Sequence, residues 1–325
     1  MRDGTDLPDN YRVWAWREGN DPLELRSETR PLPRPGPGEV LVRNHVIGLN
    51  PVDWKVLGSP GIEPGNVAGV DGAGMVVAVG QGVPVAWIGE RVAYHSNIPA
   101  HGSYAEYTPL PARVLLRVPP QVDFVTAAAM PCPGLTAQLA LNKLPALAKG
   151  RLFVSGAGGS VGHFLVQMAA AAGWSVTARS NTRHHEKLSG FGATNIPNDA
   201  SPDVGHFHAV IDMTSADQAA GLAQALKANG HLVTIQGRVD GWINDPFSEC
   251  RSLHEVALGA MHAHGDDEDW QSLVRQGEAI LSDLATGTLQ PEKTVSRPFD
   301  KLPEHLDALK NRNFSGKPVV TLSRT

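Results

Sequence analysis

The sequence predicts an α/β protein of two parts, a mainly β N-terminal half followed by a parallel, doubly wound sheet. Three observations predict this fold class. Residues 151–162 have the pattern of a buried strand, a glycine-rich turn and a helix. The chain after this point alternates strands with helices, which is typical of a parallel sheet. The first ~120 residues instead hold short apolar runs that begin at glycines, as in a β domain with many turns.

The glycine-rich turn is a variant of the dinucleotide-binding fingerprint. In Arg151–Gly162 (RLFVSGAGGSVG), the apolar run is followed by Ala157-x-Gly159-x-x-Gly162. Gly159 would let the backbone approach a pyrophosphate at the helix N-terminus, and Gly162 would let the helix pack closely on the strand. The pattern alone leaves one alternative open, a tight turn that binds nothing.

The type of dinucleotide is indicated by the residues about 20 positions past the turn, where the adenine ribose is bound. An NAD-binding protein usually has Asp or Glu there, whereas this chain has Arg179, Ser180 and Arg183 and no acid before Glu186. A guanidinium pairs with phosphate through two parallel hydrogen bonds, so these residues favour a 2′-phosphate. The sequence therefore predicts NADP(H), with solvated surface arginines as the alternative.

The composition argues against several other classes of protein. The 325 residues are 42% hydrophobic and 19% charged, which is typical of a globular chain. The net charge of −5 and the lack of a basic block argue against nucleic acid or a membrane as partner. Two cysteines support neither a disulfide framework nor a cysteine-rich metal site. Without an apolar leader or an apolar run of about 18 residues, a cytoplasmic protein is expected.

The other elements are predicted from short apolar runs and their flanking glycines, prolines and caps. In the β half we expect strands over 11–16, 39–49, 67–79, 89–94 and 102–107. In the α/β half we expect helices over 134–141 and 216–228 and strands over 152–154, 174–178, 208–212, 230–235 and 254–262. The remainder should hold a helix over 266–284 with an acidic first turn, a helix over 300–310 and a strand over 317–322.

A series of short motifs, in this order and spacing, covers nearly the whole chain from Pro35 to Val320. The motifs are Gly48–Lys55, Gly69–Val76, Gly89–Val92, Gly102–Tyr107, Pro131–Ala137, Ala157–Gly162 and Gly316–Val320. With these motifs the chain resembles the medium-chain dehydrogenase/reductases. Within that superfamily it is similar to the zinc-free, zeta-crystallin-like quinone oxidoreductases and the 2-alkenal and enoyl reductases.

The resemblance implies a domain organisation. Residues 1–127 and 266–325 would form a GroES-like catalytic domain, and residues 128–265 a Rossmann NADP-binding domain. In such relatives the sixth Rossmann strand often pairs with its twin across a dimer. Here that strand would lie near Val256–Met261, so a homodimer is expected, with a monomer whose edge is covered as the alternative.

The resemblance also bears on zinc. The zinc alcohol dehydrogenases of this superfamily take catalytic ligands from three places, where this chain has Asn50, Val70 and Cys132. One thiolate does not make a site that needs three protein ligands. The structural zinc lobe would also be missing, because residues 95–101 form a short loop without cysteine. We therefore expect no zinc and no other metal, with Cys132 a small packed residue beside the cofactor cleft.

Without a metal, the acceptor must itself be electrophilic. Quinones and α,β-unsaturated carbonyls qualify because conjugation spreads the incoming negative charge to oxygen. The resemblance thus implies an NADPH-dependent reductase of a small-molecule quinone or enone. A redox-silent NADP(H)-binding sensor or accessory protein stays open. So does an enoyl reductase of a biosynthetic pathway acting on carrier-bound acyl chains; a basic docking patch would favour it, and the sequence has no obvious one.

Site residues follow from the same resemblance. Asn50 and Lys55 would hydrogen-bond the developing oxyanion, Asp53 would fix the loop or the cofactor ribose, and Tyr94 would donate a proton. For Lys55 and Tyr94 the alternative is an exposed or packing role. Trp54 would wall the substrate pocket or belong to the core. The residues expected at the cofactor are Thr136, Gly159, Ser160, Val161, Arg179, Ser180, Arg183, Gln236, Gly237, Asn313 and Lys317. The histidines at 184, 185, 262 and 264 have no ligand spacing and are predicted to be surface or edge residues.

Overall fold

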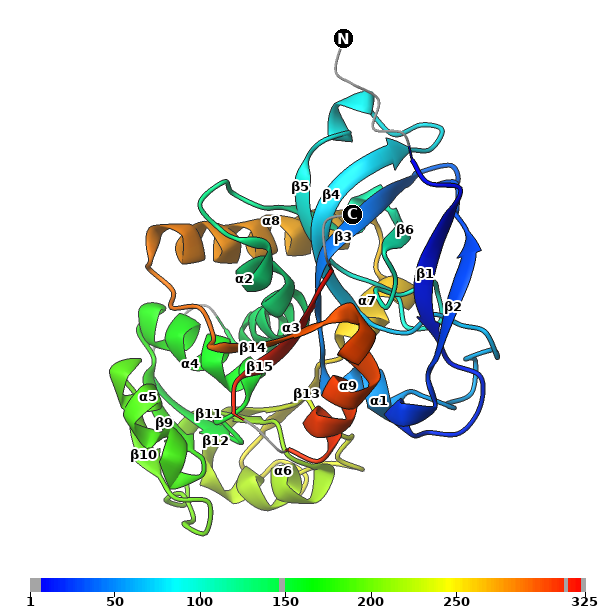
Figure 1. The fold of residues 1–325 in the computed structure, drawn as a ribbon. Coiled ribbons are helices and arrows are strands. Elements are labelled where there is room, and N and C mark those ends of the chain that lie inside the picture. The colour runs from blue at the N-terminus through cyan, green and yellow to red at the C-terminus, as the bar shows by residue number, and fades with distance from the viewer. Residues whose placement is uncertain (1–6, 146–149, 313–314, 323–325) are drawn as a thin grey trace. The chain divides into compact units, whose positions relative to one another are not determined.

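The structure is a computed structural model that describes residues 7–145, 150–312 and 315–322, and these form two compact units. The first unit comprises Met1–Cys132 and Gly259–Thr325, and the second comprises Pro133–Leu258. From the sequence, the two boundaries were expected after residues 127 and 265. In Figure 1 the second unit is coloured green to yellow, while the first runs from blue to cyan and again from orange to red.

The first unit contains a mainly antiparallel sheet that the C-terminal segment completes. The strand order is β14-β15-β3-β4-β5-β7, with β6 also paired to β3. The strands are β3 (Glu39–Gly48), β4 (Asp71–Val79), β5 (Arg91–His95), β6 (Tyr107–Pro111), β7 (Leu115–Arg117), β14 (Thr294–Pro298) and β15 (Lys317–Thr321). Val320 pairs with Ile47, so the end of the chain lies beside the strand that leads to Asn50.

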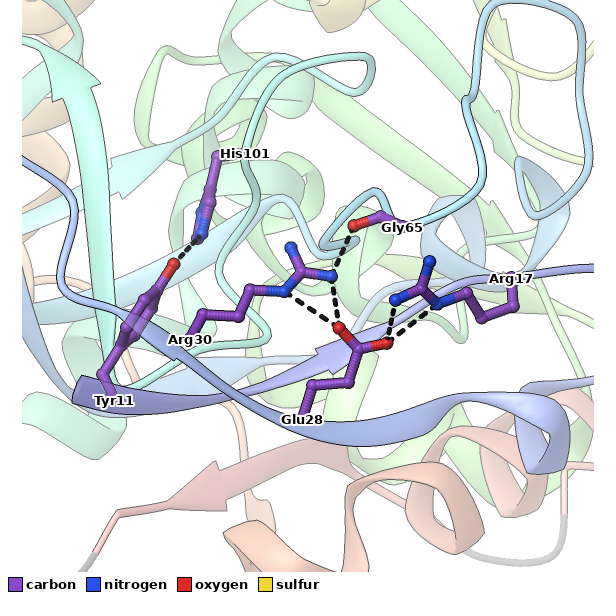
Figure 2. A network of polar contacts seen from close by, with 6 residues as sticks. All are labelled: Tyr11, Arg17, Glu28, Arg30, Gly65 and His101. Carbon is purple, nitrogen blue, oxygen red and sulfur yellow. Dashed lines mark hydrogen bonds and ion pairs between the residues drawn. The ribbon is translucent and has the colours of Figure 1, made fainter.

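A separate hairpin, β1 (Asn10–Ala15) and β2 (Arg26–Pro31), packs its apolar face into the core of this unit. On the same face, where Glu28 is paired with Val13 and Arg30 with Tyr11, lies a half-buried ion-pair network centred on Glu28 (Figure 2). Arg17 Nε donates to Glu28 Oε1 at 2.8 Å, and Arg30 Nη2 donates to Glu28 Oε2 at 2.7 Å. Arg30 also donates to the carbonyl of Gly65, which ties the hairpin to the segment that precedes β4.

The helices of the first unit are mostly short. They are α1 (Pro51–Lys55), α2 (Phe124–Ala129), α7 (Leu258–His264), α8 (Asp267–Thr286) and α9 (Leu302–Lys310), with α7 beginning at the boundary. The long helix α8 begins as predicted, because Asp266 and Asp269 form a reciprocal capping box. It ends at Gly287, whose φ of 78° is the left-handed conformation that favours glycine.

The second unit is a parallel sheet in the order β10-β9-β8-β11-β12-β13. Its strands are β8 (Arg151–Ser155), β9 (Ser175–Arg179), β10 (Thr194–Ile196), β11 (Phe207–Asp212), β12 (Leu226–Thr234) and β13 (Ser252–Glu255). Its helices are α3 (Pro131–Asn142), which begins at the boundary, α4 (Ser160–Ala171), α5 (His185–Gly190) and α6 (Ala216–Leu222). This is the doubly wound order whose topological switch point, between β8 and β11, is where such sheets bind ligands.

The two-part α/β fold class is confirmed, but several predicted elements were wrong. The strand expected over 254–262 is instead the end of β13 and the helix α7. The helix expected over 216–228 ends at Leu222, because residues from Leu226 onward pair with β11. The strand expected over 102–107 begins only at Tyr107. Short apolar runs do not distinguish strand from helix by periodicity, and tertiary pairing decides between them.

Candidate functional site

The glycine-rich turn between β8 and α4 has the geometry of a phosphate-binding loop. A Cβ on Gly162 would lie 2.2 Å from the carbonyl oxygen of Ala157, so only glycine permits this close packing. A Cβ on Gly159 would meet no atom within 4 Å, so the space beside this residue is open. Gly159 is the N-cap of α4 and provides no side-chain cap, so the first backbone N–H groups, including those of Ser160 and Val161, can bind an anion. These residues fit the pyrophosphate of a dinucleotide.

Arg179, at the end of β9, has a different surrounding from the one expected. Arg179 is only 9% exposed, and its guanidinium donates to Ser155 Oγ at 2.9 Å and to Gln218 Oε1. It also lies over the Phe153 ring, and burial lowers its pKa. The backbone carbonyl of Arg179 accepts hydrogen bonds from the first two residues of the glycine-rich turn. Arg179 therefore holds together the ends of β8, β9 and α6.

The other two predicted 2′-phosphate residues differ in exposure. Ser180 is 2% exposed, and its hydroxyl donates to the carbonyl of Asn181. Arg183 is exposed, and its Nε donates to His184 Nε2 at 3.1 Å. His184 packs against the turn, because a Cβ on Gly158 would lie 2.4 Å from its ring. Burial and the neighbouring cations Lys187 and Arg183 lower the pKa of His184. The accessible charge here thus comes from Arg183, with His184 beside it.

The remaining cofactor candidates are distributed over both units. Thr136 is a buried residue of α3. Gln236 and Gly237 follow β12, and Gly237 has a φ of 81° with Ala216, the first residue of α6, close to it. Asn313 lies outside the described residues. Next to Arg179, a pocket of about 180 Å³ is lined by residues that include Ser201, Pro202, Asp217 and Gln218.

A buried polar cluster lies in the first unit, where α1 begins. The amide of Asn50 is held at both ends: Lys317 Nζ donates to its Oδ1, and its Nδ2 donates to Asp71 Oδ2 at 2.8 Å. Lys317 Nζ is also 3.9 Å from Asp71 Oδ2. All three residues are 0–3% exposed, so the charges of Lys317 and Asp71 compensate each other away from water. Asn50 keeps one further amide N–H, the donor that it could offer to an oxyanion.

The carboxyl groups of this cluster have displaced pKa values. Asp53, 1% exposed, accepts from the backbone N–H of Asn50 at 2.7 Å and of Val70 at 3.1 Å, and so fixes this loop. Burial raises its pKa to about 6, against the lowering effect of these bonds and of Lys317. Burial likewise raises the pKa of Asp71 to about 7, although the charge of Lys317 opposes the rise.

Two catalytic candidates do not join this cluster. Tyr94 is fully buried, its hydroxyl donates to Asn44 Oδ1 at 2.7 Å, and burial raises its pKa well above the ordinary value. The structure argues against a proton-donor role for such a residue. Lys55 is exposed at the other end of α1, and its ammonium lies 5.8 Å from the ring centroid of half-buried Trp54.

Asn50, Val70 and Cys132, at the positions compared with zinc ligands, make hydrogen bonds to buried carboxyl groups. The backbone N–H of Cys132 donates to both carboxylate oxygens of Asp71 at 3.0 Å, and the N–H of Val70 donates to Asp53. Within residues 7–145, 150–312 and 315–322, no three His, Cys, Asp or Glu side chains converge on a possible metal site. The cation in this region is the Lys317 ammonium. That the protein needs no zinc stays a prediction.

Sequence reasoning missed several residues near the cluster. Asp71 was not among the predicted site residues, and Lys317 was expected at the cofactor. His95 lies opposite Asp71 on neighbouring antiparallel strands, and its Nδ1 is 3.0 Å from His262 Nε2. His262 is therefore not a plain surface residue, and burial lowers its pKa to about 4. A lone Asp after a Gly-Val pair carries no pattern, so no signal in the sequence identified these contacts.

Comparison with known proteins defines the class of this chain. A family model for the alcohol dehydrogenase GroES-like domain matches residues 36–120. The trans-enoyl reductase ccsC of Aspergillus clavatus is 30% identical over 346 residues, covering 93% of this chain and 94% of that protein. The quinone oxidoreductase of Sus scrofa is 27% identical over 341 residues, covering 99% and 100%.

Solved structures have the same fold. A quinone oxidoreductase of Pseudomonas syringae superimposes with a TM-score of 0.83 at 23% identity, covering 96% of this chain and 99% of that one. The chain belongs to the medium-chain dehydrogenase/reductase superfamily, with a GroES-like domain and a Rossmann-type domain, as predicted. Within that superfamily it belongs with the quinone oxidoreductases and trans-enoyl reductases.

Proposed function

We propose that the protein is an NADPH-dependent reductase that transfers hydride to a quinone or an α,β-unsaturated carbonyl without a metal. The observation that supports this most directly is the turn at Gly159 and Gly162, with its open helix N-terminus and the exposed Arg183 beyond β9. The named activities of the relatives, quinone oxidoreductase and trans-enoyl reductase, point to the same chemistry.

The cofactor supplies a hydride, and the residues of this chain position it. Ser160 and Val161 would bind the pyrophosphate through their backbone N–H groups, and Arg183 would pair with the 2′-phosphate. Arg179 holds the strand ends that carry these groups. Gln236 and Gly237, beyond β12, and Thr136 on α3 would border the nicotinamide, as in the relatives that the motifs resemble.

The Asn50 cluster would handle the charge that develops on the acceptor. Hydride addition to an enone or quinone leaves negative charge on oxygen, and a proton from solvent completes the two-electron reduction. The free N–H of Asn50 would donate to that oxygen, and the nearby Lys317 ammonium would stabilise it electrostatically. Lys317 and Asp71 fix the orientation of the Asn50 amide, so no reorganisation is needed during reaction.

The test is oxidation of NADPH and NADH with phenanthrenequinone, benzoquinone and a small enone, each with and without a chelator. We expect NADPH-dependent turnover that the chelator leaves unchanged, and the ranking of acceptors separates quinone from enone chemistry. Loss of activity with the chelator would overturn the metal-free mechanism. Tight NADPH binding without turnover of any acceptor would favour a redox-silent sensor instead.

We also propose that the protein is a cytoplasmic homodimer that pairs through β13. This strand is at the edge of the six-stranded sheet, where its unpaired side can add another strand. None of the helices that the structure describes is long and apolar enough to cross a bilayer. Light scattering coupled to gel filtration measures the mass, and a monomer at micromolar concentration would contradict the dimer.

A further inference from the structure

Two histidines of the first unit form a hydrogen-bonded pair. His95 Nδ1 is 3.0 Å from His262 Nε2, and the two rings stack with 5.2 Å between their centroids. His95, the last residue of β5, is 3% exposed, whereas His262, on α7, is half-buried. One nitrogen of this contact donates a proton and the other accepts it. The pair therefore connects a buried ring to a ring that solvent can reach.

His95 lies beside the cluster formed by Asn50, Asp71 and Lys317. It is directly opposite Asp71 on the neighbouring antiparallel strand, so the two side chains point to the same face of the sheet, with Cβ atoms about 5 Å apart. Asp71 Oδ2 in turn accepts the amide N–H of Asn50 at 2.8 Å. Asp71 is thus a neighbour that His95 shares with the proposed oxyanion donor.

The second ring nitrogen of His95 is unusual for a buried imidazole. In the part of the chain that the structure describes, His95 Nε2 has no hydrogen-bond partner. His101, in the same unit, instead uses both of its ring nitrogens, one with the Tyr11 hydroxyl at 2.7 Å and one with the Gly102 carbonyl at 3.1 Å. A polar atom in a buried side chain that lacks a protein partner calls for a water molecule or a ligand.

Both rings of the pair are held in the neutral form. Burial lowers the pKa of His95 well below its ordinary value, and the charges of His262 and Lys317 add to this effect. Burial and the charge of Arg113 lower the pKa of His262 to about 4. A neutral imidazole donates with one nitrogen and accepts with the other, which is what the transfer of a proton through two rings requires.

We propose that His95 donates the proton of the reduction from Nε2, and that His262 replaces this proton from solvent. The inference rests on the proposed reductase function. It moves the role predicted for Tyr94 to the next residue of the chain, which points to the opposite face of the sheet.

The proton transfer balances as follows for an enone. Hydride adds to the β-carbon, the electrons of the C=C bond form an enolate whose oxygen Asn50 holds, and the α-carbon takes the proton of His95 Nε2. His95 Nδ1 then takes the proton of His262 Nε2, and His262 Nδ1 takes one from water. Both rings stay neutral, and exchange with water restores their first tautomers after the product leaves.

Enones and quinones differ in their need for this proton. Hydride addition to a quinone gives a hydroquinone anion, a weak base that can leave the site and take its proton from water. An enolate is a much stronger base, and its α-carbon needs a positioned donor. Loss of His95 should therefore slow the reduction of enones more than that of quinones.

The test compares His95→Gln with the matched control His101→Gln, using benzoquinone and an enone that carries a methyl group on its α-carbon. In His95→Gln, kcat for the enone should fall about 100-fold, while kcat for benzoquinone should change little. Wild type should give one enantiomer of the reduced enone, and His95→Gln should give a racemic product because water then supplies the proton. His101→Gln should leave both rates and the product unchanged.

His262→Phe separates the two roles. It should slow the reduction of the enone but still give one enantiomer, because His95 remains in place. Equal losses of kcat for both acceptors in His95→Gln would show a structural role and overturn the proposal, as would an unchanged enantiomeric purity.

A failure of the reductase function is distinguishable from a failure of this inference. If wild type reduces no acceptor, the proposed function is wrong, and nitrogen NMR of the histidine rings tests the pair without turnover. We expect two neutral rings at neutral pH, with the His95 proton on Nε2. A charged ring, or a His95 proton on Nδ1, would refute the transfer through the pair.

Discussion

The two candidate sites are built from different parts of the chain. In the second unit the binding surface is mainly backbone, where Gly159 leaves open space at the N-terminus of α4. In the first unit it is a set of buried side chains, Lys317, Asn50 and Asp71, whose charges compensate one another. A substitution in the first unit therefore changes buried charge, and so stability. In the second unit, a substitution that adds side-chain volume at the open helix N-terminus changes whether the ligand fits.

The largest effect is expected at Lys317. Lys317→Met would leave two buried carboxyl groups without their cation and lower the free energy of unfolding by about 3–5 kcal/mol. The loss should shrink at low pH, where the carboxyl groups become protonated. Urea unfolding at several pH values measures it. Lys301→Met, at an exposed ion pair, should cost less than about 1 kcal/mol; equal losses in the two variants would refute the importance of burial.

Gly159 and Gly162, at the turn between β8 and α4, allow stability and cofactor binding to be tested separately. Gly162→Ala places a Cβ 2.2 Å from the carbonyl oxygen of Ala157 and should destabilise the protein by about 1–3 kcal/mol. Gly159→Ala meets no protein atom, so stability should stay within about 0.5 kcal/mol of wild type. It should nevertheless raise the Kd for NADPH, since the Cβ fills the space proposed for the pyrophosphate. Unchanged NADPH affinity in Gly159→Ala would show that the phosphates lie elsewhere.

Arg179, at the end of β9, and Arg183, beyond it, should separate cofactor selectivity from structure. Arg183→Ala should raise the KM for NADPH about tenfold and leave the KM for NADH unchanged, because only NADPH carries the 2′-phosphate. Arg179→Ala should instead lower the thermal midpoint and affect both cofactors alike, since its guanidinium joins Ser155 and Gln218. Steady-state kinetics with both cofactors measure the KM values, and a thermal melt measures stability. If Arg179→Ala changed the KM for NADPH alone and Arg183→Ala lowered the thermal midpoint, the two proposed roles would be exchanged.

The pH dependence of stability is a further test of the Asp71 cluster. The pKa of Asp71 is raised from 3.8 to about 7 and that of Asp53 to about 6. A raised folded-state pKa adds stability that is fully present below about pH 4 and is lost as pH rises through 6 and 7. Asp71→Asn should therefore flatten the decline between pH 4 and 7 in urea titrations. Asp217→Asn, an exposed control on α6, should keep the wild-type slope.

Parts of the fold were predictable because local chemistry and tertiary packing agree there. The Arg151–Gly162 segment became β8, the turn and the start of α4, and the acidic cap at Asp266 starts α8 as predicted. The strand predicted near Val256–Met261 was wrong. Its residues suit both a strand and a helix, and pairing with β12 stops at Glu255. With β13 at Ser252–Glu255, the proposed dimer strand moves N-terminally from its predicted position.

The sequence by itself determined the superfamily, the two-part fold and the glycine-rich turn, because these depend on local patterns and on motif order. The tertiary structure alone decided the electrostatics. It buried Lys317 against Asn50 and Asp71, turned Tyr94 toward Asn44, and brought Lys55 and Lys310 to the ring of Trp54. The physical reason is that a charge acquires its pKa, its partners and its role from neighbours in space. Those neighbours are far away in the sequence.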